Sequence, residues 1–106
     1  MKNEFLIVKN IKEFIVSLDN FLNNYPRKEY ELRNRLVNTS YDLLELVYQS
    51  NYKKDFNFNI ILSKISMLDF YLELSFKKKI INEKSVMNMS NRLLVIRKMI
   101  YKWYES

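Results

Sequence analysis

Two pairs of carboxylates are spaced so that each pair would share one face of a helix. Asp69 and Glu73 lie four residues apart, and Asp42 and Glu45 lie three apart. Helix bundles can hold two metal ions between such carboxylates, but that design also uses Glu-x-x-His motifs, and this chain has no histidine. Basic residues flank both pairs, which favours exposed ion pairing. We therefore predict no metal site and no cofactor.

The chain lacks two side chains that often act as nucleophile and general base, cysteine and histidine. Without cysteine and histidine the chain has no thiol nucleophile and no imidazole base, and without glycine it has no phosphate-binding glycine loop. A serine or tyrosine would depend on lysine as its base. Ser63 and Lys64, like Ser40 and Tyr41, are adjacent, and adjacent helical residues point in different directions. We expect no catalytic residue and no enzymatic activity.

Basic side chains are the remaining groups with a definite chemistry. Eighteen lysines and arginines against twelve acids give a net charge of +6, and the whole excess lies beyond residue 24. Cations that neutralise phosphates release counterions, so they bind nucleic acid in a salt-sensitive and largely sequence-independent way. Lysines at helix ends also serve solubility and match the helix dipole, and charge alone does not separate the two roles. The candidate contacts to nucleic acid are Arg27, Arg35, Lys53, Lys54, Lys77, Lys78, Lys79, Arg97, Lys98 and Lys102.

Four segments repeat apolar residues every three or four positions, which is typical of helices with one buried face. The absence of glycine and the single proline, Pro26, argue against β-hairpins. We predict an all-α protein, an antiparallel up-down-up-down four-helix bundle in one domain over residues 1–106. The first helix ends before Asn23, the second runs from about Pro26 to Ser50, the third from Phe58 to Lys77–Lys79, and the fourth follows Asn82 as its N-cap.

That topology predicts where the cations meet. One end of the bundle would collect Arg27, Lys28, Lys77, Lys78, Lys79 and Lys84, and the other end Lys53, Lys54, Arg97, Lys98 and Lys102. Tyrosines are interspersed among them and could offer stacking faces to bases, namely Tyr30, Tyr52, Tyr101 and Tyr104.

Two helices carry an apolar stripe besides the one that a bundle core needs. On the fourth helix it consists of Met87, Leu94 and Tyr101, and on the second of Val37, Tyr41, Leu44 and Tyr48. These residues could widen contacts with flanking helices inside one chain. Interfaces are rich in tyrosine and methionine, so we favour a subunit interface of a homo-oligomer.

No apolar run, such as residues 5–8, is longer than four residues, which is too short to cross a membrane. The start of the chain, MKNE, has an acidic residue before a short apolar stretch and does not resemble a secretion signal. We expect a cytoplasmic protein without a membrane partner.

Several stretches resemble the Avd-like family of four-helix bundles over about residues 25–106. They are ELRNRL at 31–36, LLELV at 43–47, NYKKD at 51–55 and the closing IRKMIYKW at 96–103. The family comprises accessory proteins of diversity-generating retroelements and relatives encoded within intervening sequences of large ribosomal RNA genes. The resemblance implies a basic, ring-like homo-oligomer, a pentamer, that binds a reverse transcriptase and nucleic acid, RNA or cDNA, in mutagenic cDNA synthesis.

By the same resemblance, Arg35 and Lys98 match basic positions of the family, and Met99 and Trp103 match packing positions. The chain departs from the pattern on its third helix, where Asp69 and Glu73 replace arginines, and before Trp103, where Tyr101 and Lys102 replace paired glycines. The first departure removes basic surface, and the second makes the last helix bulkier.

Our leading hypothesis is a non-catalytic accessory protein that binds nucleic acid and a reverse transcriptase. Two alternatives stay open. One is a protein-interaction scaffold whose lysines only keep it soluble. The other is a ribosomal intervening-sequence relative that shares the fold and has no reverse transcriptase partner.

Overall fold

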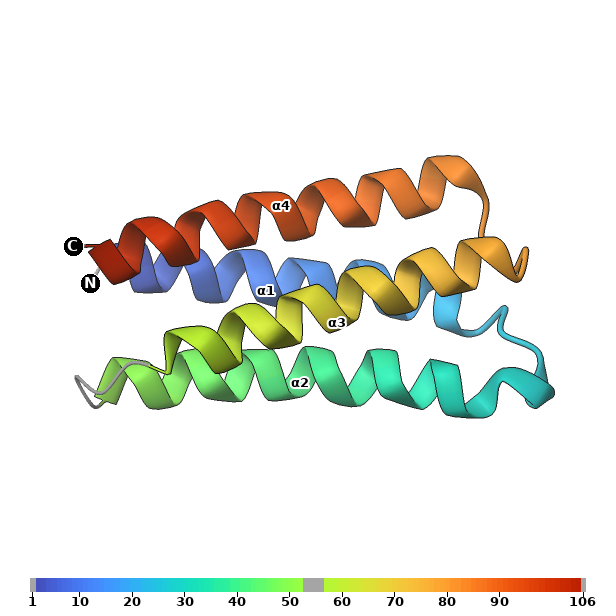
Figure 1. The fold of residues 1–106 in the computed structure, drawn as a ribbon, viewed down its shortest axis with the longest axis horizontal. Coiled ribbons are helices and arrows are strands. Elements are labelled where there is room, and N and C mark those ends of the chain that lie inside the picture. Colours follow the sequence, from blue (N-terminus) through green and yellow to red (C-terminus); the bar gives the residue numbers. More distant parts are fainter. Residues whose placement is uncertain (1, 53–56, 106) are drawn as a thin grey trace.

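The computed structural model describes residues 2–52 and 57–105, and these form four long helices. The helices are α1 (Lys2–Leu22), α2 (Tyr30–Tyr52), α3 (Phe58–Lys77) and α4 (Glu83–Glu105), with a short 3-10 helix, η1 (Arg27–Glu29), before α2. Consecutive helices are antiparallel, and α1 also packs against α4, which closes the bundle (Figure 1). The predicted all-α four-helix bundle is confirmed.

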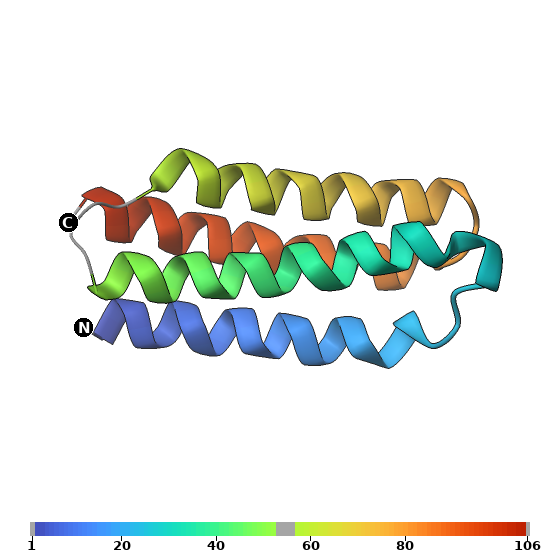
Figure 2. The same ribbon diagram turned by 90° about the horizontal axis from the view of Figure 1, so that it is seen from below.

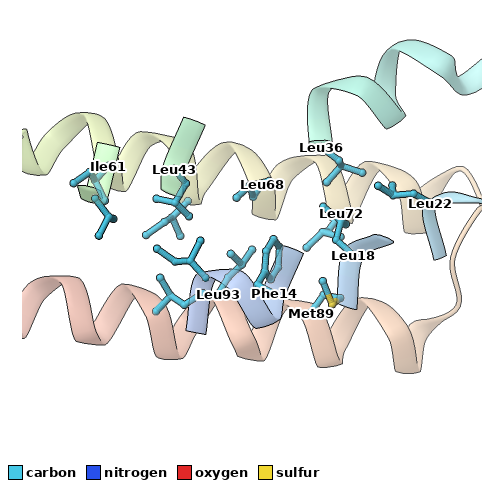
Figure 3. Close-up of a cluster of buried hydrophobic side chains, with 14 of the residues drawn as sticks. Phe14, Leu18, Leu22, Leu36, Leu43, Ile61, Leu68, Leu72, Met89 and Leu93 are labelled. Carbon is cyan, nitrogen blue, oxygen red and sulfur yellow. The ribbon is translucent and has the colours of Figure 1, made fainter. Parts of the chain in front are cut away.

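The core lies along the bundle axis and receives the predicted apolar stripe of every helix (Figure 3). Phe14 of α1 is fully buried, as are Leu36, Leu68 and Leu93 of the other three helices. Truncating one such buried side chain to alanine typically costs about 2–5 kcal/mol, several times what an exposed ion pair contributes. Apolar packing therefore stabilises the bundle, and exposed ion pairs contribute little to its stability.

The second helix begins later than predicted. Pro26 is extended, with φ −62° and ψ 154°, and makes no side-chain cap. The Glu29 N–H donates to the Pro26 carbonyl oxygen over 2.9 Å, which closes one 3-10 turn before α2 starts at Tyr30. Proline has no side-chain oxygen with which to cap free N–H groups, so the short turn satisfies the backbone instead.

The turn after α3 has a left-handed residue at the position where such turns usually have glycine. The Ile80 N–H donates to the Ser75 carbonyl and the Lys79 N–H to that of Phe76, each over 2.9 Å, which is the Schellman arrangement. Lys79 is left-handed, with φ 61°. Glycine normally takes this position, and a side chain there costs roughly 1 kcal/mol. The predicted N-cap of α4 is confirmed, because Asn82 Oδ1 accepts the Ser85 N–H over 2.8 Å.

Over the residues that the structure describes, none of the helices combines the length and apolar character that crossing a membrane requires.

Candidate nucleic-acid interface

The α1–α2 and α3–α4 connections lie at the same end of the bundle, which we call the loop end (Figures 1 and 2). The start of α1 and the end of α4 lie at the other end. This arrangement follows from the antiparallel order of the helices, and it brings segments about 50 residues apart in sequence side by side.

Three side-chain bonds tie the loop end together. The Tyr25 hydroxyl donates to Ser75 Oγ over 2.7 Å, and Ser75 Oγ donates to the Tyr71 carbonyl over 2.8 Å, so the α1–α2 connection is joined to α3. Burial raises the pKa of the Tyr25 hydroxyl, while the bond to Ser75 opposes that rise. Lys78 Nζ donates to Glu29 Oε1 over 3.0 Å across the two connections. These bonds fix the backbone of the loop end, and the Glu29 pair holds the Lys78 side chain.

Most cations at the loop end have no acid to neutralise them. Among the described residues, Arg27, Lys28, Lys79 and Lys84 have no carboxylate within ion-pair distance. Lys77 pairs with Glu73 over 3.1 Å and Lys78 pairs with Glu29. The structure therefore brings together the predicted candidates Arg27, Lys77, Lys78 and Lys79 at one end, together with Lys28 and Lys84.

Arg35 lies further along α2 and pairs with Glu31 over 3.6 Å. Both side chains are largely exposed. Exposed ion pairs one helical turn apart contribute only about 0.3–0.5 kcal/mol, so this pairing holds the guanidinium weakly. Arg35 shares a groove between α2 and α3 with Lys28 and Lys78, and the groove also contains their acidic partners Glu29 and Glu31.

Arg97 differs from the loop-end cations. Its guanidinium lies 3.7 Å from Asp69 Oδ2 and donates to Ser66 Oγ over 3.4 Å, and only 28% of the side chain is exposed. Burial raises the pKa of Asp69, and the Arg97 charge opposes that rise. We expected Arg97 to gather with other cations toward the far end. The structure instead places it against Asp69, where α3 and α4 pack side by side.

Of the remaining candidates of that far group, the structure describes Lys98 and Lys102, which lie one turn apart on α4. Lys98 and Lys102 are exposed on α4 and have no carboxylate partner in the described ranges. Lys53 and Lys54 lie outside the described residues. Tyr101 and Tyr104 both pack on the Phe58 ring, with centroids 5.0 and 4.1 Å away, so those rings are engaged within the chain. Tyr30, at the loop end, is exposed.

Three of the four predicted carboxylates pair with cations in the described part of the chain, and Glu45 does not. Asp42 pairs with Lys64 over 3.4 Å, in addition to the Asp69 and Glu73 pairs described above. In residues 2–52 and 57–105 no group of three acidic side chains comes close enough to hold a metal ion.

The two extra apolar stripes differ in exposure. Met87, Leu94 and Tyr101 are exposed along α4. On α2 only Tyr41 is exposed to that degree, while Val37 and Leu44 pack against the core and the Lys12 ammonium lies 5.9 Å from the centroid of the Tyr48 ring. The packing of flanking helices inside one chain therefore accounts for much of the α2 stripe, whereas the α4 stripe faces outward.

Sequence reasoning missed an apolar surface on α3. Ile60, Met67 and Phe70 are exposed there, and so is Phe76, which the periodicity assigns to the buried stripe. Phe76 is 40% exposed, and the buried position in that last turn of α3 belongs to Ser75. The number of apolar residues on α3 was the available signal, since they exceed what one buried stripe needs.

Comparisons with protein-family models, curated proteins and solved structures find no significant match for this chain.

Proposed function

We propose that the protein is a non-catalytic nucleic-acid-binding protein that acts as a homo-oligomer. The observation that supports this most directly is the loop end, where Arg27, Lys28, Lys79 and Lys84 present charge that no described carboxylate neutralises. A solvated solubilising surface needs only scattered charge. A gathering of unpaired cations on a rigid surface favours a polyanion, because the backbone phosphates can replace the missing acids.

The mechanism is electrostatic. Each cation that meets a phosphate releases a condensed counterion, and the gain in free energy falls as salt rises. Such contacts position the strand and carry no sequence information. Several copies of the loop end in one oligomer would bind one strand at several points, which raises avidity without any new contact.

The oligomer would form through the outward stripe of α4, consisting of Met87, Leu94 and Tyr101. Its exposed methionine and tyrosine are side chains that interfaces favour. The resemblance of residues 25–106 to the Avd-like family supports a more specific role as the accessory partner of a reverse transcriptase, bound to template RNA or cDNA. Co-purification from the native host, with identification of the bound protein and nucleic acid, tests that role.

Binding of a fluorescent RNA over a salt series tests the proposed function. We expect affinity to fall linearly on a logarithmic salt scale, with a slope of about −0.7 for each phosphate contacted on a single strand. No binding at low salt, or a slope near zero, would contradict the electrostatic mechanism.

The α4 stripe also favours one rival, a protein-interaction scaffold without a nucleic-acid partner. The scaffold would keep its partner at high salt and would not bind RNA.

Light scattering of Met87→Glu and Leu94→Glu measures the contribution of the α4 stripe to assembly, and Met67→Glu on α3 is a matched control at another exposed methionine. We expect both α4 variants to fall toward the monomer mass of 13.0 kDa while the control keeps the assembly. A wild type that is monomeric at micromolar concentration would remove the oligomer from the proposal.

A further inference from the structure

The turn between α3 and α4 borders a shallow, open pocket of mixed chemistry at the loop end. Its lining consists of Phe76, Lys77, Lys79, Ile80, Ile81 and Asn82. Ile81 is buried in the core cluster, and Ile80 is half-buried against it, so the floor is apolar and anchored. Phe76 adds an aromatic ring, 40% of which is exposed.

The polar groups of the pocket complement a phosphate-bearing ligand. Lys79 has no carboxylate partner among the described residues, and Lys77 is held only by an exposed pair with Glu73 one turn away. Asn82 Oδ1 accepts the Ser85 N–H, and the Asn82 amide nitrogen keeps its hydrogens for another acceptor. Donors and positive charge thus surround an apolar, partly aromatic floor.

The backbone preforms this pocket. Its turn is closed by the bonds from Lys79 N–H to Phe76 and from Ile80 N–H to Ser75, and Ser75 is itself held by Tyr25. The left-handed conformation of Lys79 places a cation where glycine would be more stable. A non-glycine residue held in this region often marks a site where the side chain has a function.

We propose that this pocket receives an unpaired base of a single-stranded nucleic acid, with Phe76 as the stacking face and Lys77 and Lys79 on the flanking phosphates. The inference rests on the proposed function and adds a substrate class to it. A base is planar and apolar on its faces and carries a phosphate on each side, which matches a ring bordered by cations. The bases of a duplex are already stacked, so a duplex could use only the cations.

Binding of two oligonucleotides of equal length and charge tests the inference, one single strand with all its bases and one made of abasic sites. We expect the wild type to bind the base-containing strand about fivefold to tenfold more tightly. This ratio corresponds to the lower part of the range of stacking free energies for one base on an aromatic ring. Phe76→Leu keeps the apolar character and should abolish that preference. Phe70→Leu alters a phenylalanine of α3 that is 51% exposed and does not line the pocket, and it should keep the preference.

The outcomes separate the pocket from the proposed function. Equal, salt-sensitive binding of both strands overturns the base pocket and leaves electrostatic binding in place. A preference that survives Phe76→Leu, or that Phe70→Leu also removes, overturns the assignment to this pocket. Absence of binding to either strand at low salt contradicts the proposed function itself. The comparison on the wild type needs no variant, so it decides the base preference even if Phe76→Leu does not fold.

Discussion

The loop end and the contact between α3 and α4 both carry basic side chains, yet the two regions use them differently. At the α3–α4 contact, Arg97 lies against Asp69 and Ser66, and its charge is paired within the chain. At the loop end, Arg27 and Lys79 have no acidic partner among the described residues. The same residue types therefore support packing in one region and are available to a ligand in the other.

The difference shows why net charge is a poor guide to a binding surface. Ion pairing removes equal numbers of positive and negative charges, so the net charge of +6 does not say where the unpaired cations lie. Whether a cation is paired depends on the register of neighbouring helices, as in the meeting of Arg97 with Asp69, 28 positions away in sequence.

Reversing charge at the loop end should have the largest effect. Lys28→Glu combined with Lys79→Glu should weaken RNA binding about tenfold or more and make the salt slope shallower by about 1–2, because two phosphate contacts are lost. Lys98→Glu with Lys102→Glu makes the same change in net charge on exposed α4 positions and should cost less than about threefold. Fluorescence anisotropy over a salt series measures both. Equal losses would mean that net charge, and not the loop end, governs binding.

Removing the cation at the α3–α4 contact should affect stability and not binding. Arg97→Met takes away the charge that opposes the rise in the pKa of Asp69, so that pKa rises further above its ordinary value of 3.8. A carboxyl whose folded pKa is raised stabilises the fold below its unfolded pKa and loses that stabilisation as pH rises through the folded value. We expect a loss of about 1 kcal/mol near pH 7, moderated by the partial exposure of both groups, that shrinks as pH falls toward about 4.

Urea unfolding at the two pH values measures this loss, and RNA affinity of the same variant should stay within about twofold of wild type. A large loss of RNA affinity in Arg97→Met, with stability intact, would erase the distinction between the two regions.

Tyr25→Phe tests the buried bond that joins the α1–α2 connection to α3. Ser75 Oγ still donates to the Tyr71 carbonyl, so the expected loss is about 0.5–1 kcal/mol at neutral pH. Burial raises the pKa of Tyr25 above 10.0, and the stability that its hydroxyl contributes is present below that value and lost as pH rises through the folded pKa. The gap between wild type and variant in urea unfolding should therefore narrow above about pH 10. A gap that is constant with pH would argue against ionisation of this hydroxyl.

Lys79→Gly should have the smallest effect and should act in opposite directions on stability and binding. Relief of the left-handed conformation should raise the free energy of unfolding by about 0.5 kcal/mol, while the salt slope of RNA binding falls by about 0.7. Lys77 is the last residue of α3 and has no left-handed strain to relieve, so Lys77→Gly should not raise the free energy of unfolding. Thermal unfolding with an anisotropy titration measures both quantities. If Lys79→Gly stabilised the fold and left binding unchanged, Lys79 would be a tolerated residue without a role in the site.

Several features of the fold were predictable because they depend on local pattern. The apolar spacing of residues such as Ile11, Phe14 and Leu18 predicted a buried helix face, and all three are buried. The lack of glycine argued against β-hairpins, and four helices with short connections predicted an antiparallel bundle with a common end for Lys28 and Lys79. The buried face of a helix follows from the spacing of its apolar residues, and the direction of successive helices follows from their short connections. Both could therefore be predicted from the sequence.

The partners of individual side chains depend on how the helices pack against one another, and they could not be predicted from the sequence. The sequence did not reveal that Arg97 would meet Asp69, that the α2 stripe would turn partly inward, or that Phe76 would line a pocket beside Lys79. Each outcome depends on the rotation and axial position of one helix against another, and contacts between residues far apart in sequence set both. Periodicity specifies the side of a helix that is buried, whereas only the packed bundle specifies what each side chain meets.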